Sequence, residues 1–546
     1  MSEISTNTDH KLLEDESHGL IDWLLHVQST DPDRVLASGI LDSEYVQITA
    51  SELVAKSLKL ASGLLSIGVS PGSTLGLWIP NRIEWLITQF ACSSLGVSIL
   101  GINTRYRSHE IAHLFKTVPL SAIVLPNNFL SIDFLGTLGD AINEVEDSSD
   151  SFIRPLLVFV GDVPGEAISI SKESFSFGEL LSNGALDPTQ KYGKSLSNLF
   201  TTSGSTSAPK VAGHSQHSIV RHSFAGAKAL EVVPGDCILA VLPLCGVFGF
   251  NSVFALLFGG GSAALVETFD AVQAAEQLIE LSITHVVGGD EMIGAIFSEV
   301  DSTQKLPALR RGGIANFAGR SKEIVVMAKE RWGTIISGVY GSSELFALSA
   351  IWPTSAQVDI RGLGGGIVVD AGIEVRIADI DTDELISEGD SGELQFRGYN
   401  VIDEYLNNPK SSLSAFSSDG WFKTGDLGYI DHGGFVYQCR AREALRLRGF
   451  LVEPGEIEEF ILLDTSIDEV HVVGLDTESG TKAFAFVRTI QDLKIDEAKM
   501  MAYAKKHLAS YKVPERIIQV NEFPTTTGTN GTKVRFEELR EIAKSL

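Results

Sequence analysis

The feature that most constrains the fold is an alternation of short apolar runs with amphipathic stretches, from about residue 19 to about residue 430. Ser51–Ile67 has apolar side chains at helical spacing, and Thr74–Ile79 is typical of a buried strand. The pattern recurs as a predicted helix over Glu84–Gly96 and a strand over Val97–Gly101. Strands joined through helices favour parallel pairing in sheets that helices cover. The sequence therefore predicts an α/β protein with several mainly parallel sheets.

The last hundred residues have a different pattern. Glu469–Leu475 and Lys482–Arg488 are predicted strands around a turn at Asp476–Gly480, and Ile495–Leu508 has helical spacing. Upstream, Glu144–Asp150 is predicted to be an acidic loop. A chain of 546 residues exceeds one ordinary core, so two or three domains are expected. We predict a flexible lead over residues 1–18, a large N-terminal domain over 19–438 and a small mobile α+β domain over 439–546.

The charge balance limits the possible partners. The formal net charge is -27 at pH 7, which argues against nucleic acid because phosphate backbones need a positive surface. An anionic small molecule would require a local basic patch. Four scattered cysteines and a polar start without a leader pattern predict buried free thiols in the cytoplasm.

One segment, Cys237–Val266, carries no charged residue and is long enough for a membrane helix. Pro243, Gly246 and residues 259–261 interrupt it, so a buried strand, a loop, a helix and a turn are predicted instead. No membrane span is expected, although a membrane protein built on this segment stays open as an alternative.

A run rich in hydroxyl groups, Thr201–Lys210, follows the predicted strand Leu196–Phe200. Its hydroxyls and backbone amides can donate to phosphate oxygens, and its terminal lysine can neutralise phosphate charge. Such a run is often only a solvated loop, but its Pro209–Lys210 end favours a polyphosphate site.

This run resembles the phosphate loop of the adenylate-forming superfamily, which comprises acyl-CoA synthetases, nonribosomal adenylation domains and luciferases. Ser207 and Val211 stand where glycine is usual, whereas the side-chain donors are retained. The resemblance implies that ATP and AMP phosphates contact Thr202, Ser203, Gly204, Ser205, Thr206 and Lys210.

Two further motifs resemble the nucleotide-binding motifs of that family. Val339–Glu344 is similar to its Tyr-Gly-x-Thr-Glu motif, and Trp421–Asp426 to its Tyr-Arg-Thr-Gly-Asp motif. The resemblance implies that Asp426 accepts hydrogen bonds from the ribose. A carboxylate suits Mg²⁺ and an aromatic ring suits a flat base. In the first motif, Val339, Tyr340 and Gly341 are implied to contact adenine and its surroundings. Ser343 is implied to contact the phosphate or the acyl carboxylate, and Glu344 to bind Mg²⁺.

Arg440–Glu458 resembles the family's hinge and thiol-step segment, and Thr525–Arg535 resembles its catalytic-lysine motif. The resemblance implies that Arg440 contacts the nucleotide, that Arg442 is the hinge, and that Arg446 and Gly449 serve thiol attack. Four arginines between residues 440 and 448 also supply the basic patch required above. Lys533, preceded by Thr532 where glycine is usual, would bridge the substrate carboxylate and the α-phosphate.

The acyl site departs from the family pattern. Gly246 occupies a position where histidine or an aromatic residue is usual, which predicts a larger pocket for a bulky acid unless Phe248 or Phe250 fills it. Asn316 and Phe317 replace a Gly-Ala pair and are predicted to reshape the same pocket. The nearby His214, His217 and His222 lack carboxylate neighbours and are interpreted as helix or surface residues.

The resemblance covers the chain from about residue 30 to its end. It implies an acyl-CoA synthetase that uses ATP, Mg²⁺ and CoA to convert a carboxylic acid first to an acyl-adenylate and then to a thioester. A carrier protein as acceptor, an enzyme of one half-reaction and a nucleotide-binding pseudoenzyme stay open as alternatives.

Overall fold

The computed structural model describes residues 12–147, 152–171, 173–202, 210–387, 389–441, 445–447, 450–452, 454–477, 480–490, 493–508, 512–528 and 531–546. The chain divides into two compact units. Unit 1 comprises Met1–Glu374 and Phe396–Phe422, and unit 2 comprises Val375–Gln395 and Lys423–Leu546. The predicted α/β class, with a large multi-sheet part and a small C-terminal part, is confirmed. The boundary between residues 438 and 439 stays a prediction.

The first sheet of unit 1 has the strand order β7-β6-β5-β3-β4-β8-β9. All neighbours in it pair in parallel except β8 and β9, which are antiparallel. Parallel β3, β4 and β8 direct their carboxyl ends to one edge, and β8 leads into the predicted phosphate loop. The strands are β3 (Thr74–Leu77), β4 (Ser98–Gly101), β5 (Ala122–Pro126), β6 (Leu156–Val160), β7 (Ser174–Ser176), β8 (Leu196–Thr201) and β9 (Val211–Ser215).

A second series of strands in unit 1 has the order β16-β15-β14-β13-β12-β10-β11-β1-β2. From β14 to β1 the pairs are parallel, and antiparallel pairs close both ends. The strands are β1 (Val35–Leu41), β2 (Glu44–Thr49), β10 (Cys237–Ala240), β11 (Ser262–Leu265), β12 (His285–Gly289), β13 (Arg311–Ala315), β14 (Ile335–Tyr340), β15 (Ala350–Ile351) and β16 (Gly365–Val368).

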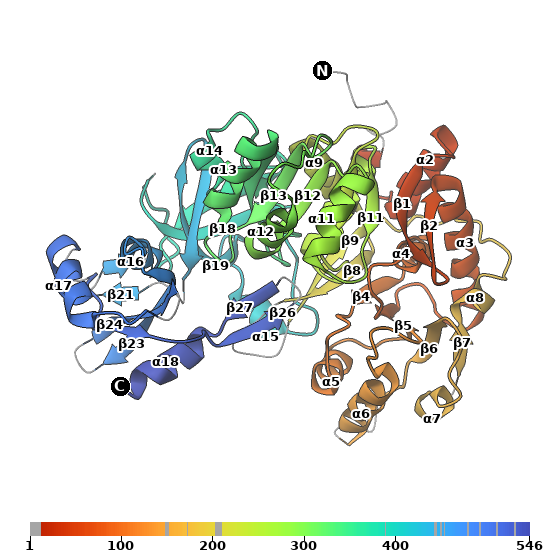
Figure 1. Ribbon diagram of the computed structural model, residues 1–546. Coiled ribbons are helices and arrows are strands. Elements are labelled where there is room, and N and C mark those ends of the chain that lie inside the picture. The colour runs from red at the N-terminus through yellow and green to blue at the C-terminus, as the bar shows by residue number, and fades with distance from the viewer. Residues whose placement is uncertain are drawn as a thin grey trace. The chain divides into compact units, whose positions relative to one another are not determined.

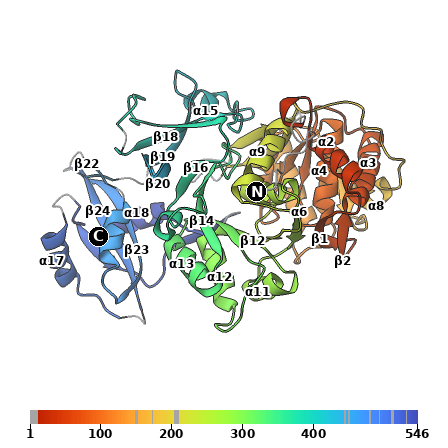
Figure 2. The same ribbon diagram turned by 90° about the horizontal axis from the view of Figure 1, so that it is seen from above.

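Helices cover these strands, and α2, α3 and α4 lie together beside β1 and β2 (Figures 1 and 2). Every residue of α4 is buried, and the helix ends at Gly96 with a φ of 66°. A Cβ at Gly96 would lie 2.3 Å from the Tyr192 ring, so only glycine fits this turn. The main helices of unit 1 are α2 (Leu20–Thr30), α3 (Ala50–Ser66), α4 (Ile83–Leu95), α5 (Ser108–Thr117), α6 (Phe134–Glu146), α9 (Gln216–Ala229), α10 (Val247–Phe258), α11 (Ala271–Glu280), α12 (Asp290–Glu299) and α13 (Ser321–Trp332).

An aromatic cluster forms the core beneath the second series of strands. Phe250 stacks on Phe254 with centroids 4.1 Å apart, and it meets Trp85 and Phe200 edge-on at 5.6 Å. Rings of this size contribute about 2–3 kcal/mol each when fully buried. The cluster thus fixes α10 against α4 and β8, the strand that leads to the phosphate loop.

Unit 2 combines the strand order β17-β18-β19-β20 with a three-stranded sheet β23-β24-β25 and two hairpins. The predicted C-terminal strands and helix are present, with β23 and β24 extending further than predicted. The elements are β17 (Ile373–Ala378), β18 (Gly392–Gly398), β19 (Phe422–Asp431), β20 (Gly434–Arg440), β21 (Leu445–Leu447), β22 (Phe450–Val452), α16 (Pro454–Ile461), β23 (Ile467–Thr477), β24 (Gly480–Thr489), α17 (Glu497–His507), β25 (Arg516–Gln519), β26 (Thr525–Gly528), β27 (Gly531–Val534) and α18 (Phe536–Lys544).

Two predictions from the sequence need correction. Glu144–Glu146 end the amphipathic helix α6 rather than lying in a loop, because Ala141, Ile142 and Val145 anchor that turn in the core. The cysteines are free thiols, but only Cys92 and Cys245 are buried, whereas Cys237 and Cys439 are half-buried. In the segment 237–266, α10 lies between β10 and β11, and none of the described helices is long and apolar enough to cross a membrane.

Candidate active site

The flanks of the predicted phosphate loop meet at the end of the antiparallel pair β8–β9. The Thr202 amide donates to the Lys210 carbonyl over 2.9 Å, and the Lys210 amide donates to the Thr202 hydroxyl over 3.3 Å. Ser203, Gly204, Ser205 and Thr206 lie outside the described residues. The two described ends of the predicted loop therefore lie together, and its phosphate contacts stay predictions.

The predicted adenine and Mg²⁺ motif occupies the end of β14 and the loop that follows. Val339 and Tyr340 are buried, and the Tyr340 ring stacks on Phe396 with centroids 5.5 Å apart. A Cβ at Gly341 would lie 2.6 Å from the carbonyl carbon of Ala347, so the loop can fold back only at glycine. The Ser343 hydroxyl donates to the Thr201 carbonyl over 3.5 Å, which joins this loop to the strand before the phosphate loop.

Tyr405 connects the two nucleotide motifs, and it was not among the predicted site residues. Its hydroxyl donates to Glu344 Oε1 over 2.8 Å, while Lys210 Nζ lies 4.6 Å from the centroid of its ring. The Leu406 amide donates to the Val211 carbonyl, which holds this segment beside β9. Lys210 and Glu344 are therefore oriented by one aromatic side chain. Tyr405 lies within the part of the chain that resembles the family, but none of the motifs described above includes it.

The interpretation of the three histidines as helix or surface residues holds for His217 and His222, which are in α9, and is wrong for His214, which is in a strand. His214 in β9 and His222 in α9 are fully buried. His214 hydrogen-bonds to the Ser343 carbonyl over 2.7 Å, and His222 hydrogen-bonds to the Ala347 carbonyl over 3.1 Å. Burial lowers the pKa of each imidazole from 6.5 to about 4. Both rings are therefore neutral at pH 7.

Unit 1 is expected to lose stability as the pH falls from about 6.5 toward 4. The unfolded histidines take up protons in this range, whereas His214 and His222 in the folded state do so only near pH 4. The free energy of unfolding is thus highest above pH 6.5, and at pH 5 it is lower by about 2 kcal/mol for each ring. Urea unfolding at pH 7, 6 and 5 checks this, and His222→Gln should show a smaller loss. An equal loss in the variant would contradict the assignment to this ring.

The predicted acyl-site residues lie on two separate elements. Gly246 is the N-cap of α10, and Phe248 is buried in its first turn. Phe317 is 46% exposed, and Asn316 Oδ1 accepts from the Ser321 amide over 3.3 Å. A residue that the sequence did not reveal fixes this second segment. The buried Asp290 carboxylate accepts from the amides of Glu291, Phe317, Ala318 and Arg320 at 2.8–3.1 Å.

In unit 2 the predicted ribose residue and its arginine lie opposite each other. Asp426 of β19 pairs with Arg440 of β20, and Arg440 Nε lies 3.0 Å from Asp426 Oδ1. The Asp426 side chain is 5% exposed, and that of Arg440 is 43% exposed. Antiparallel register therefore presents a carboxylate and a guanidinium side by side, a combination suited to ribose hydroxyls and phosphate.

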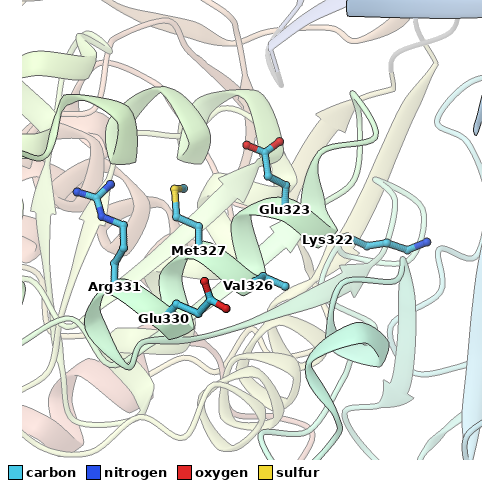
Figure 3. Close-up of a pocket in the computed structure, with 6 residues that line it drawn as sticks. All are labelled: Lys322, Glu323, Val326, Met327, Glu330 and Arg331. Carbon is cyan, nitrogen blue, oxygen red and sulfur yellow. The ribbon is translucent and has the colours of Figure 1, made fainter. Parts of the chain in front are cut away.

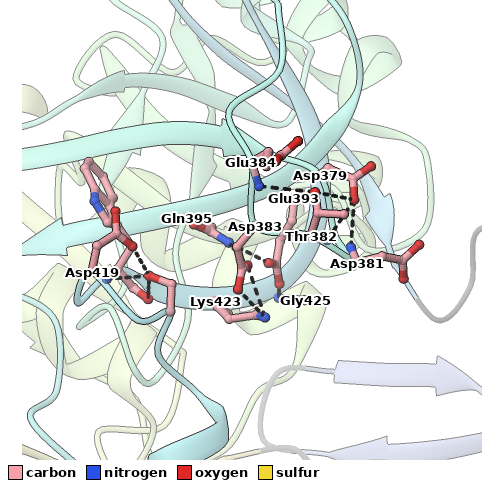
Figure 4. A network of polar contacts seen from close by, with 12 residues as sticks. Asp379, Asp381, Thr382, Asp383, Glu384, Glu393, Gln395, Asp419, Lys423 and Gly425 are labelled. Atoms are coloured by element: carbon pink, nitrogen blue, oxygen red, sulfur yellow. Dashed lines mark hydrogen bonds and ion pairs between the residues drawn. The ribbon is translucent and has the colours of Figure 1, made fainter.

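A polar network surrounds the start of β19, just before Asp426 (Figure 4). The Glu393 carboxylate accepts from the Gly425 amide and from Gln395 Nε2, each over 2.9 Å. Lys423 Nζ lies 3.1 Å from the Asp383 carboxylate, which also accepts from Gln395 Nε2. These bonds tie β18 to the start of β19, so the approach to Asp426 is rigid.

Two of the remaining predicted residues of unit 2 are in its hairpins. Arg446 is in β21, and Lys533 is in β27 at a register position opposite Thr526 of β26. Arg442 and Gly449 lie outside the described residues. The roles of all four in the hinge, the thiol step and catalysis stay predictions.

Two further observations bear on the choice of site. A pocket on α13 is lined by Lys322, Glu323, Val326, Met327, Glu330 and Arg331 (Figure 3), none of which is a predicted site residue.

Among the described ranges, no group of three His, Cys, Asp or Glu side chains could hold a metal ion. Magnesium at nucleotide sites is usually held by one or two carboxylates together with phosphates. The half-buried Glu344 carboxylate, oriented by Tyr405, fits that requirement.

The fold of the chain matches solved structures over almost its whole length. Its structure matches ATP-bound MatB from Rhodopseudomonas palustris with a TM-score of 0.81 at 22% identity, covering 96% of this chain and 99% of that one. It matches the anthranilate CoA ligase AuaEII in complex with anthranoyl-AMP with a TM-score of 0.81 at 21% identity, covering 97% and 98%. These likenesses define the fold class.

Sequence comparison gives the family. The profile of the AMP-binding enzyme matches residues 25–406, and that of the AMP-binding enzyme C-terminal domain matches residues 456–529. The chain therefore belongs to the AMP-binding enzyme family.

Two relatives illustrate its membership. The medium-chain acyl-CoA ligase ACSF2, mitochondrial, of Danio rerio is 28% identical over 93% of this chain and 86% of its own length. The second relative is a CoA ligase of Rhodococcus jostii (strain RHA1), named for a methyl-dioxo-octahydroindenyl propanoyl group. It is 26% identical over 91% of this chain and 94% of its own length. The prediction of an ATP-dependent acid–thiol ligase is confirmed.

Proposed function

We propose that this enzyme activates an apolar carboxylic acid with MgATP and transfers the acyl group to coenzyme A. The observation that carries the proposal is the bridge from Lys210 through Tyr405 to Glu344, because it places an ammonium and a carboxylate around one end of the predicted phosphate loop. An ammonium there neutralises phosphate charge, and a carboxylate there suits Mg²⁺. Bound Mg²⁺ would offset the charge that develops on the phosphates.

In the first half-reaction, a carboxylate oxygen of the substrate attacks the α-phosphorus of ATP. The bond from that phosphorus to pyrophosphate breaks, which leaves acyl-AMP. Lys533 stabilises the charge on the attacking and leaving oxygens. Ser343 contacts the phosphate or the acyl carboxylate, Tyr340 packs on adenine, and Asp426 with Arg440 binds the ribose and phosphate.

In the second half-reaction, the sulfur of CoA attacks the acyl carbon and the bond to AMP breaks. The thiol proton passes to solvent, and AMP leaves with the oxygen that came from the acid. Arg446 and Gly449 serve this step after a rotation about Arg442. No nucleophilic side chain of the enzyme is needed, which agrees with the high pKa, about 12, of the buried Cys245 thiol.

The acid is proposed to be apolar and of medium or large size. All residues of α10 are buried, and Gly246 at its start has no side chain to fill space. The relatives named above act, by their names, on medium-chain acyl and polycyclic groups. The proposed compartment is the cytoplasm, where free thiols such as those of this chain persist.

The test is release of AMP and pyrophosphate from MgATP with a panel of medium-chain, aromatic and polycyclic acids, each with and without CoA. CoA-dependent AMP release with one class of acid is the expected result. Acid-dependent pyrophosphate exchange without transfer to CoA would instead indicate a carrier protein as acceptor. If no acid supports turnover and synthetic acyl-adenylates are also refused, the proposal fails.

A further inference from the structure

The loop from Gly341 to Ser349, called the magnesium loop below because it carries Glu344, has an unfavourable backbone. Phe346, Ala347 and Leu348 have φ values of 56°, 50° and 31°, a left-handed conformation that side chains with a Cβ rarely adopt. Consecutive residues of this kind persist only where the surroundings impose the conformation. The magnesium loop makes hydrogen bonds within itself, such as that from the Ala347 amide to the Ser342 carbonyl over 2.9 Å, and contacts from other segments add to them.

Those contacts are hydrogen bonds to the carbonyl groups of the loop. His214 of β9 binds the carbonyl of Ser343 over 2.7 Å, and His222 of α9 binds that of Ala347 over 3.1 Å. Between them, Asn400 Nδ2 donates to the Leu345 carbonyl over 2.8 Å, and the Ile402 amide donates to the Glu344 carbonyl over 3.0 Å. Donors distant in sequence thus hold the backbone on both sides of Glu344.

The two histidines also pack on either side of the Phe346 side chain of the magnesium loop. Phe346 is fully buried, and its ring centroid lies 4.9 Å from the His214 ring and 5.4 Å from the His222 ring. Because a carbonyl only accepts, each neutral imidazole must carry its proton on Nε2. Each histidine ring therefore both donates a hydrogen bond to the loop and packs against Phe346.

The tautomer of His222 is fixed by a chain of partners behind it. Its Nδ1 accepts from the Tyr399 hydroxyl over 3.1 Å. The Arg221 guanidinium lies 4.0 Å from the centroid of the Tyr399 ring, and Arg221 Nη2 donates to Asp370 over 2.7 Å. An arrangement of this extent around one buried ring indicates that the orientation of its Nε2–H matters.

We propose that His214 and His222 are positioning residues that hold the magnesium loop in the shape required to bind the metal–nucleotide complex. This inference rests on the proposed function and assigns to two histidines a role in orienting Glu344 without contact to the substrate. The expected consequence is selective: affinity for ATP with Mg²⁺ depends on the two rings more strongly than affinity for AMP without Mg²⁺, because Glu344 serves only the first.

The test compares four variants of the full chain, three of them in α9. His222→Leu removes the donor but keeps bulk, and His222→Gln keeps an amide donor near the position of Nε2. His217→Leu is the matched control, because His217 is on the same helix but interacts electrostatically with Asp15 and Glu16. Calorimetry gives Kd for ATP with Mg²⁺ and for AMP with EDTA, and hydrogen exchange of peptides covering residues 341–349 reports on the loop without ligand.

For His222→Leu we expect a rise of about tenfold in the Kd of MgATP, a change within about twofold for AMP, and faster exchange of the loop amides. His222→Gln and His217→Leu should stay within about twofold of the wild type. His214→Met tests the same claim from the other ring, so misfolding of one variant does not remove the test.

Unchanged loop exchange and unchanged MgATP affinity in a folded His222→Leu would overturn the inference, and so would equal weakening of AMP and MgATP. Failure of the wild type itself to bind MgATP would instead contradict the proposed function. The two failures are therefore distinguishable.

Discussion

Replacing Lys533 with alanine is expected to slow acyl-adenylate formation by about 100- to 1000-fold, because a preorganised cation at the reacting phosphate contributes on that scale. The reaction of a synthetic acyl-adenylate with CoA should change little, since Lys533 is proposed to act only in the first half-reaction. Acid-dependent pyrophosphate exchange measures the first step, and thioester formation from the adenylate measures the second.

Lys544→Ala is the matched control for this prediction. Lys544 is an exposed lysine of α18 that pairs with Glu541, so its removal changes net charge equally without touching the proposed chemistry. A similar loss in both variants, or full pyrophosphate exchange in Lys533→Ala, would contradict the assignment of Lys533.

Replacing Glu344 with glutamine is the second change with a large expected effect. The amide keeps the size of the side chain and can still accept from Tyr405, but it loses the charge that suits Mg²⁺. We expect adenylation to fall about 100-fold at limiting Mg²⁺ and to recover partly at high Mg²⁺. The rate is measured across a Mg²⁺ titration, with thermal unfolding as a check on folding.

Tyr405→Phe separates the charge of Glu344 from its orientation. The variant loses one hydrogen bond to the carboxylate and keeps the ring beside Lys210, so a loss of about tenfold or less is expected. If Glu344→Gln kept the wild-type Mg²⁺ dependence, another group would have to hold the metal.

The local pattern of the sequence predicted the elements of the fold but not how they combine. The helical spacing of Ser51–Ile67 and the apolar run at Thr74 correspond to α3 and β3, because burial of one face imposes the period of each element. No local period shows that Val375–Gln395 joins unit 2 while Phe396–Phe422 joins unit 1. That division depends on pairing between strands distant in the chain.

Candidate site residues could be proposed from the sequence where motifs are contiguous, and not where contacts join distant segments. Val339–Glu344 and Asp426 are predicted from short patterns, and their roles stay predictions. The burial of His214 and His222 could not be predicted because their partners, Ser343 and Ala347, are 129 and 125 residues away. Asp290 gave no signal either, since a buried carboxylate that binds loop amides has the same local sequence as a helix N-terminus.

Transfer of an oxygen isotope is the most direct test of the central claim that the chain activates an acid as its adenylate. The acid that supports turnover is labelled with ¹⁸O in its carboxylate and incubated with enzyme, MgATP and CoA, and the AMP is analysed by mass spectrometry. Attack of the carboxylate on the α-phosphorus predicts AMP that carries one ¹⁸O for each thioester formed. Label in inorganic phosphate, or thioester formation with unlabelled AMP, would contradict the mechanism.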